Sequence, residues 1–270
     1  MRIGLGQMNT GNRKSDNLAT ADTMIKELAD SGASLIMLPE YFNFLGPESQ
    51  MADNAEPVNS SPSLDMIRER AVKYQLHIHI GSFLERDESY IFNTGIVFNP
   101  AGEIIAKYRK IHLFDVEIPG GKRYLESETI TPGDTVATFT IDDLTFGMST
   151  CYDLRFPEMF RKLGEMGANV ILLPAAFTMQ TGRDHWELLL RARAVENLCW
   201  VVAAGQYGTS PPDNICYGRT MVINPWGIVT AQAPDGVHTL TAEIDLATLH
   251  QIRTTFPALN HKRKDIFSAN

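Results

Sequence analysis

Two short sequence patterns occur twice in the chain, and they limit the folds that it can adopt. The apolar segment Ala-Ser-Leu-Ile-Met-Leu-Pro at 33–39 resembles Ala-Asn-Val-Ile-Leu-Leu-Pro at 168–174. The turn Asn-Pro-Ala-Gly at 99–102 likewise resembles Asn-Pro-Trp-Gly at 224–227. Amphipathic segments of helical length lie between the strand-like runs. Self-similarity of this kind indicates two halves built from the same β and α units.

Two such halves predict a four-layer α-β-β-α sandwich. Each half would form one sheet with helices on its outer face, and the two sheets would pack against each other. We therefore expect an α/β fold with an internal pseudo-twofold repeat, in a single domain spanning residues 1–270. A single doubly wound sheet is the alternative, because it also alternates strands and helices.

The bulk composition argues against several classes of function. The net charge of −8 disfavours a general nucleic-acid binder, since phosphates select basic surfaces. No apolar run approaches the 18 residues of a membrane span, and the first residues lack the apolar stretch of a signal peptide. Three cysteines are an odd number in a large chain and predict free thiols in a reducing cytoplasm.

Cys151 lies where a strand is predicted to give way to a helix. The apolar run at 144–148 predicts a buried strand, and Pro157 suits the first turn of a helix, where its missing N–H costs nothing. Backbone N–H groups and the positive end of a helix dipole lower the pKa of a nearby thiol. We expect Cys151 to be a nucleophile of this kind, with a buried structural cysteine as the alternative.

Glu40 and Lys110 are the residues expected to assist this nucleophile. Glu40 follows the first Leu-Pro, whereas Ala175 follows the second, so the carboxylate is not part of the repeated scaffold. A cysteine nucleophile needs a base, donors for an oxyanion and an acid for the leaving group. Glu40 would serve as base and then as acid, while Lys110 and the backbone N–H of Tyr152 would hold the oxyanion.

Other arrangements remain open at this point. A cysteine–histidine hydrolase would use His112 or His185, which are near the suggestive segments. His77 and His79 share one face of a predicted strand, but without a third ligand at matching spacing we predict no metal site. The chain could also be a catalytically silent scaffold that binds carboxylates or protein partners.

Three ordered motifs resemble the nitrilase superfamily of carbon–nitrogen hydrolases. They are Leu-Pro-Glu at 38–40, Tyr-Arg-Lys-Ile-His-Leu-Phe-Asp at 108–115 and Cys-Tyr-Asp-Leu-Arg-Phe-Pro-Glu at 151–158. The resemblance implies the α-β-β-α sandwich, a homodimer or higher homo-oligomer, no cofactor, and a Glu40–Lys110–Cys151 triad. It also implies a second catalytic glutamate, for which Glu126 is the match.

The segment at 176–197 resembles the Nit-type amidases, whose substrates are small amides that carry a distant carboxylate. This branch includes deaminated glutathione amidase, which the run Arg-Ala-Arg-Ala-Val-Glu-Asn at 191–197 favours, and ω-amidase. True nitrilases typically have tryptophan directly after the nucleophile, where this chain has Tyr152. Nitrilase and N-carbamoyl amino acid hydrolase are therefore less favoured alternatives. The resemblance implies hydrolysis through a cysteine thioester with release of ammonia.

An acidic substrate of an acidic protein needs a local cation. Arg155 is the expected carboxylate ligand because a guanidinium can bind a carboxylate through two hydrogen bonds. Tyr152 and Thr178 are expected in the same substrate-binding pocket. The alternative for Arg155 is a structural ion pair with Asp153 or Glu158.

Overall fold

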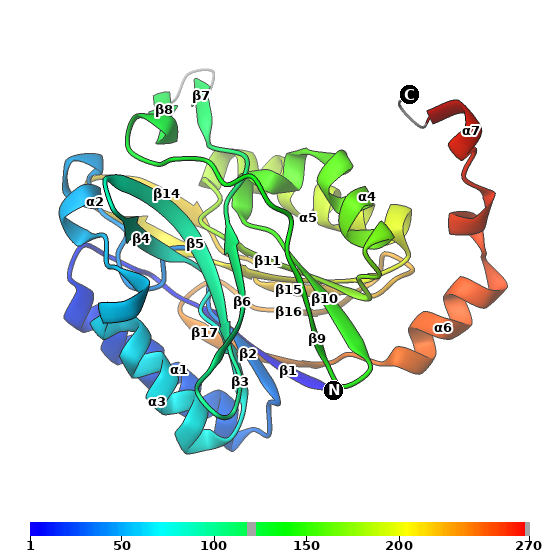
Figure 1. Ribbon diagram of the computed structural model, residues 1–270, viewed down its shortest axis with the longest axis horizontal. Helices are drawn as coiled ribbons and strands as arrows, with labels where there is room; N and C mark the ends of the chain where they lie inside the picture. Colours follow the sequence, from blue (N-terminus) through cyan, green and yellow to red (C-terminus); the bar gives the residue numbers. More distant parts are fainter. Residues whose placement is uncertain (118–122, 268–270) are drawn as a thin grey trace.

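The computed structural model describes residues 1–117 and 123–267, and the main strands of these ranges form two facing sheets (Figure 1). The first sheet has the order β17-β1-β2-β3-β5-β4, with β6 on the other edge of β5. Its strands are β1 (Arg2–Gln7), β2 (Leu35–Met37), β3 (His77–His79), β4 (Phe83–Asp87), β5 (Tyr90–Phe98), β6 (Ile104–Arg109) and β17 (His238–Glu243).

The second sheet has the order β16-β15-β12-β11-β10-β9. Its strands are β9 (Thr138–Ile141), β10 (Leu144–Met148), β11 (Val170–Ala175), β12 (Trp200–Gly205), β15 (Met221–Ile223) and β16 (Val229–Gln232). Two further antiparallel pairs lie beside the sheets. They are β7 (Asp115–Glu117) with β8 (Arg123–Leu125), and β13 (Tyr207–Ser210) with β14 (Asn214–Tyr217).

The two sheets repeat the same pairing pattern. In the first sheet, β1, β2 and β3 are parallel neighbours, and β5 and β6 follow in antiparallel pairing. In the second sheet, β10, β11 and β12 are parallel, followed by β15 and β16 in antiparallel pairing. The two Asn-Pro turns also match, because Asn99 and Asn224 each accept hydrogen bonds from the backbone two and four residues later. The predicted repeat is therefore confirmed, and the single doubly wound sheet is wrong.

Helices cover the two outer faces of the paired sheets (Figure 1). The first face carries α1 (Lys14–Asp30) and α3 (Pro62–Tyr74), and the second carries α4 (Pro157–Glu165) and α5 (Met179–Asn197). Additional helices are α2 (Glu48–Asn54), α6 (Leu246–Thr255) and α7 (Lys264–Phe267). None of the helices in the described ranges is long and apolar enough to cross a membrane.

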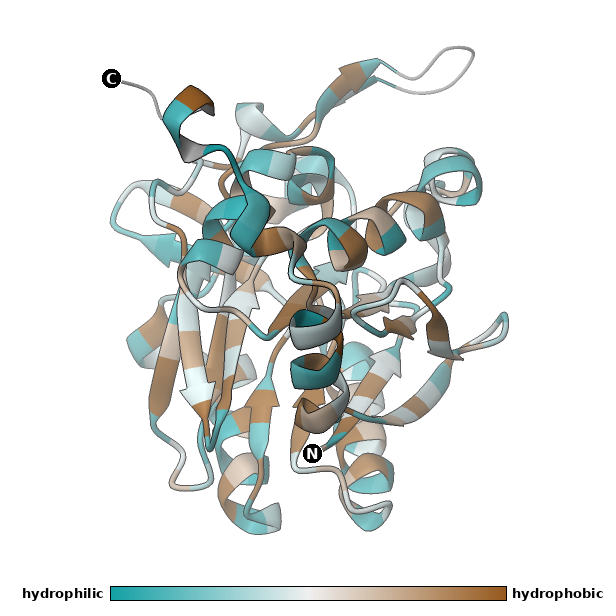
Figure 2. Ribbon diagram, turned by 90° about the vertical axis from the view of Figure 1, so that its right-hand side faces the viewer, coloured by the Kyte–Doolittle hydropathy of each residue, from teal (hydrophilic) through white to brown (hydrophobic). Residues whose placement is uncertain are grey.

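Alternation along the strands creates separate apolar layers. Leu35 and Met37 of β2 belong to a cluster that also contains residues from the second sheet, whereas Ile36 packs with residues of α1 and α3. This is the period of two that places successive side chains on opposite faces of a strand. Figure 2 shows how hydrophobic and hydrophilic residues alternate along the strands and the helices. The expected four-layer arrangement follows from this burial.

Gly81 lies in the break between β3 and β4. Gly81 adopts φ +74°, and a Cβ atom there would lie 1.9 Å from the carbonyl oxygen of Pro39. The missing side chain thus lets the backbone approach the segment that carries Glu40.

We expect Gly81→Ala to lower the free energy of unfolding by about 3 kcal/mol or more, because backbone strain and a steric overlap add together. Gly167→Ala is the matched control, since Gly167 also has positive φ but a Cβ atom would meet nothing within 4 Å. The control should lose only about 1–2 kcal/mol. Chemical denaturation of both variants measures the difference, and equal losses would contradict the close-approach argument.

Candidate active site

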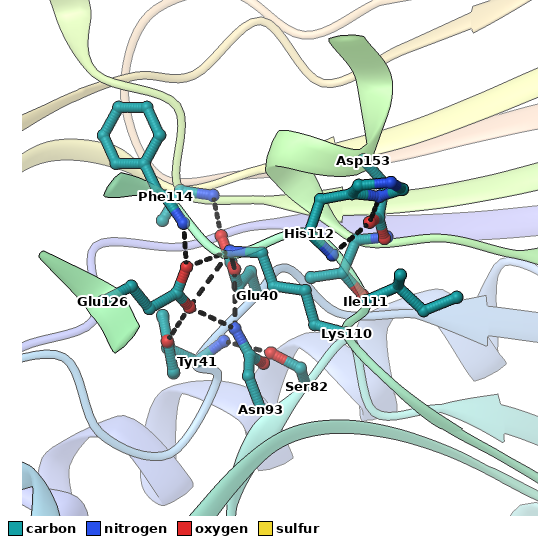
Figure 3. Close-up of polar contacts among 12 residues, drawn as sticks. Glu40, Tyr41, Ser82, Asn93, Lys110, Ile111, His112, Phe114, Glu126 and Asp153 are labelled. Atoms are coloured by element: carbon teal, nitrogen blue, oxygen red, sulfur yellow. Dashed lines mark hydrogen bonds and ion pairs between the residues drawn. The ribbon is translucent and has the colours of Figure 1, made fainter. Parts of the chain in front are cut away.

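Four predicted residues from separate segments line one cavity of about 310 Å³. Glu40 follows β2, Lys110 follows β6, Glu126 begins a 3₁₀ turn after β8, and Cys151 follows β10. Figure 3 shows how Glu40, Lys110 and Glu126 point toward one another. The ends of strands from both sheets therefore supply a common site, as α/β architectures favour.

Lys110 is the cation that joins the two glutamates (Figure 3). Its Nζ atom lies 3.1 Å from Oε1 of Glu40, and 3.0 and 2.8 Å from the two carboxylate oxygens of Glu126. Burial works to lower the pKa of the Lys110 ammonium, but the Glu126 and Glu40 carboxylates outweigh it and hold that pKa well above its usual range. Lys110 is therefore a permanent positive charge.

Glu126 is the more completely satisfied carboxylate. Besides Lys110, it accepts hydrogen bonds from the hydroxyl of Tyr41 at 2.8 Å and the backbone N–H of Phe114 at 2.7 Å. Burial works to raise the pKa of Glu126, but Lys110 and these donors hold it below its ordinary value. Glu126 is thus suited to remain an anion that fixes Lys110.

Glu40 is held in a different way, with one oxygen toward each half of the molecule. Its Oε1 atom accepts a hydrogen bond of 2.8 Å from the side-chain amide of Asn93, and its Oε2 atom accepts one of 2.7 Å from the backbone N–H of Ala176. The Cys151 thiol lines the same cavity, and the negative charge of Glu40 raises the pKa of that thiol. Glu40 is therefore the candidate base for the sulfur.

Cys151 occupies the predicted turn, but its titration differs from the prediction. Burial raises the pKa of the thiol well above its usual value and the adjacent Glu40 carboxylate raises it further, while Lys110 opposes both effects only in part. Moreover, Cys151 begins a 3₁₀ turn of residues 151–155, and α4 starts only at Pro157. The expectation of a lowered pKa is wrong, because burial and the charge of Glu40 together outweigh Lys110 and the backbone N–H of Ala176.

The backbone at Cys151 is held in an unfavourable conformation. Its φ of +48° lies in the left-handed region, which costs a non-glycine residue about 1–3 kcal/mol. Asp153 stabilises this turn by accepting hydrogen bonds from the backbone N–H groups of Thr150 and His112. The hydroxyl of Tyr108 and the ring of His112 complete its contacts, at 2.6 and 2.7 Å. A fully buried carboxylate thus fixes the strained turn.

The three expected substrate-binding residues have different outcomes. Tyr152 and Thr178 both line the cavity, where Thr178 caps the N-terminus of α5. Arg155 is not among the described residues of the wall. Its guanidinium lies 5.3 Å from the ring centroid of Phe177 and 3.3 Å from Nδ1 of His185. The alternative ion pair with Asp153 is also absent from the described contacts of Arg155. The Asp153 carboxylate instead binds the backbone N–H groups of Thr150 and His112.

Histidines occupy positions away from the thiol. His112 stacks on Phe156 and contacts Asp153, and His185 contacts Arg155. None of the seven histidines is among the described residues that line the cavity, which argues against the cysteine–histidine arrangement. His79 accepts a hydrogen bond from the backbone N–H of Gly81, and burial lowers its pKa to about 3. Across the described ranges, no group of three or more His, Cys, Asp or Glu residues is arranged to hold a metal ion.

Two residues that contact the glutamates were not found from the sequence. Asn93 donates to Glu40 and, at 3.3 Å, to Glu126, while Tyr41 donates to Glu126 (Figure 3). Asn93 is a buried polar residue within the largely apolar strand β5, which is a signal that a partner must exist nearby. Tyr41 directly follows Glu40, but its positive φ of 58° is not encoded in an obvious pattern.

Comparison with known proteins gives consistent relatives over the whole chain. ω-Amidase NIT2 of Mus musculus is 36% identical over 267 residues, covering 99% of this chain and 96% of the relative. Deaminated glutathione amidase of a Synechocystis strain is 37% identical over 261 residues, covering 95% and 96%.

Solved structures show the same similarity. Saccharomyces cerevisiae Nit3, a member of branch 10 of the nitrilase superfamily, superposes with a TM-score of 0.89 at 31% identity and covers 98% of this chain and 96% of its own. The C. elegans NitFhit protein gives a TM-score of 0.93 at 36% identity over 98% of this chain, which spans only 66% of the longer NitFhit chain. The carbon-nitrogen hydrolase family model matches residues 2–254, and the chain described here therefore belongs to the carbon–nitrogen hydrolase family.

Proposed function

We infer that this protein is an amidase that hydrolyses the C–N bond of a small, carboxylate-bearing amide through a cysteine thioester. The observation that carries the proposal is that Cys151 and Glu40 line one cavity, where Glu40 raises the pKa of the thiol and is itself paired with Lys110. A buried neutral thiol needs an adjacent base to become a nucleophile, and Glu40 is that base. Relatives named for amide hydrolysis support the same reaction.

The first half-reaction forms the thioester. The proton of Cys151 passes to Glu40 as the sulfur bonds to the amide carbon, and the carbonyl electrons move to oxygen. Lys110 and the backbone N–H of Tyr152 stabilise this oxyanion. When the carbonyl re-forms, the C–N bond breaks and Glu40 donates its proton to the leaving nitrogen.

The second half-reaction returns the enzyme to its starting state. Glu40 takes a proton from a water molecule, whose oxygen attacks the thioester carbon. The C–S bond then breaks, and the sulfur regains a proton from Glu40. Glu126 takes no proton in this scheme, because its donors hold it as an anion, and it acts by fixing Lys110.

The favoured substrate is deaminated glutathione, and the alternative is an ω-amide such as α-ketoglutaramate or succinamate. Relatives of both names match this chain to nearly the same degree, at 37% and 36% identity. We further propose a cytoplasmic location, in keeping with three cysteines that are all free.

We also propose that the protein forms a homodimer through an exposed apolar surface on α5 and the neighbouring β15–β16 turn. Trp226 packs edge-on against Phe256, and a Cβ atom at Gly227 would touch Val195 of α5. Contiguous exposed apolar residues of this kind mark an interface, and a twofold dimer pairs one surface with itself. The surface comprises Leu188, Val195, Trp226, Ile228 and Phe256.

We expect Cys151→Ala to lower kcat on a cognate amide by a factor of about 10³ or more, because no other group supplies the nucleophile. Ammonia release is followed with succinamate, α-ketoglutaramate and deaminated glutathione, and circular dichroism checks that the variant is folded. Near-normal turnover by the folded variant would refute the thioester mechanism.

The proton equilibrium of the thiol is tested by alkylation. Because burial, and after it the Glu40 carboxylate, raise the pKa of Cys151, we expect the thiol to be protonated at neutral pH, and its reaction with iodoacetamide should accelerate as the pH rises. Glu40→Gln removes that charge and should lower the thiol pKa, so alkylation becomes faster at neutral pH while turnover is lost. Glu48→Gln, at another wall carboxylate, is the control. Slower alkylation of Glu40→Gln would contradict this assignment.

The dimer proposal is tested by Leu188→Arg combined with Trp226→Arg. Two buried, unpaired guanidinium groups on each subunit should prevent association, so light scattering after size-exclusion chromatography should give half the wild-type mass. Val72→Arg, at an exposed apolar residue of α3 on the other helical layer, should leave the mass unaltered. An unchanged mass for the double variant would place the interface elsewhere.

A further inference from the structure

The charged residues on the cavity wall leave one cation for an anionic ligand. The cations among the described wall residues are Lys110 and Arg123. Lys110 is enclosed by Glu40 and Glu126, and its charge is already matched. Arg123 makes no ion pair with another described residue and is exposed at the start of β8.

Arg123 is set apart from the reacting groups by the strand that carries both it and Glu126. It begins β8, and Glu126 follows that strand directly. At the rise of a β-strand, three residues separate the two backbones by roughly 10 Å. A carboxylate bound by Arg123 would therefore belong to a part of the substrate several bonds from the scissile amide.

The remainder of the cavity suits a short uncharged spacer. Apolar side chains contribute much of its wall, including those of Leu45, Met51, Phe114 and Ile215. A further carboxylate, Glu48, also lines it and would repel a second anion. An anionic end of the substrate is thus favoured near Arg123 and disfavoured near Glu48.

Arg155 is less suited to this task than the sequence alone indicates. Its guanidinium packs 5.3 and 5.8 Å from the ring centroids of Phe177 and Tyr152. Both aromatic residues line the cavity, whereas Arg155 does not. The Arg155 guanidinium is therefore packed against these two rings and does not itself face the cavity, so the substrate would not contact it.

We propose that Arg123 binds the distal carboxylate of the substrate and selects acidic amides over neutral amides of the same length. This inference rests on the proposed amidase function and assigns the residue that determines its specificity. The guanidinium would donate two hydrogen bonds to the carboxylate, while Cys151 attacks the amide at the opposite end.

Substrate pairs that differ only at the distal group test the proposal. Succinamate is compared with butyramide, and glutaramate with pentanamide, since each neutral partner has a methyl group in place of the carboxylate. Arg123→Gln should reduce the ratio of kcat/KM for acid over neutral amide by about ten-fold or more, mainly through KM of the acid. A ratio within two-fold of wild type would overturn the proposal.

Two control variants separate this role from the general effect of losing a positive charge. Arg183→Gln makes the same charge change at an exposed residue of α5 that pairs with Asp184, and its ratio should stay at the wild-type value. Arg155→Gln tests the competing ligand. If the ratio falls with Arg155→Gln rather than with Arg123→Gln, the carboxylate is bound by Arg155 and the proposal is wrong.

A binding measurement distinguishes failure of this proposal from failure of the amidase function. Pentanoate, which carries a single carboxylate, should protect Cys151 from iodoacetamide in the wild-type protein, as followed by mass spectrometry of the Cys151 peptide, and Arg123→Gln should need about ten-fold more pentanoate. If no amide is hydrolysed but this difference is found, the anion site stands and the amidase function fails. If amides are hydrolysed and the wild-type and Arg123→Gln proteins are protected equally, the amidase function stands and only the Arg123 assignment fails.

Discussion

The ammonium group of Lys110, enclosed by two carboxylates, is the interaction on which the site depends. A buried charge without a partner is costly, so Lys110 requires Glu40 and Glu126 at the distances observed, between 2.8 and 3.1 Å. The three residues come from separate segments of the chain, after β2, after β6 and after β8. Correct packing of these segments is therefore coupled to the pairing of three charges. The same pairing holds Glu40 and Lys110 in the positions that the proposed mechanism requires.

Burial also decides how the nucleophile is used. In an exposed turn, backbone dipoles would favour a thiolate, but burial and the neighbouring Glu40 raise the pKa of Cys151. The strained turn that presents the sulfur is fixed by Asp153, whose partners Tyr108 and His112 come from the other sheet and the segment after it. The proposed nucleophile and base are thus positioned by contacts between the two halves rather than within either half.

Much of this could be predicted from the sequence, because the features involved are local or repeated. Buried strands ending in Leu-Pro and two Asn-Pro turns indicate the paired sheets, and Glu40, Lys110 and Cys151 stand at predicted strand ends. The pKa of Cys151 and the position of Arg155 could not be predicted, since both depend on which side chains surround them after folding. Asn93 was missed because a polar residue within a largely apolar strand does not reveal the partner that it meets. Arg123 belongs to no recognisable sequence motif, and it is identified only because it lines the cavity in the folded structure.

The hydrogen bond from the backbone of Ala176 to Glu40 has a consequence for the symmetry of the molecule. Glu40 follows β2, and Ala175 ends β11 at the corresponding position of the repeat, so the pseudo-twofold relation brings equivalent strand ends together. A glutamate at position 175 would add a carboxylate close to a buried site that already holds Glu40, Glu126 and the one ammonium group of Lys110. Mutual repulsion would disfavour the added charge. The small, uncharged Ala175 avoids that conflict, and the neighbouring peptide N–H of Ala176 binds the Glu40 carboxylate. The departure from symmetry therefore permits a duplicated scaffold to contain a single proposed base.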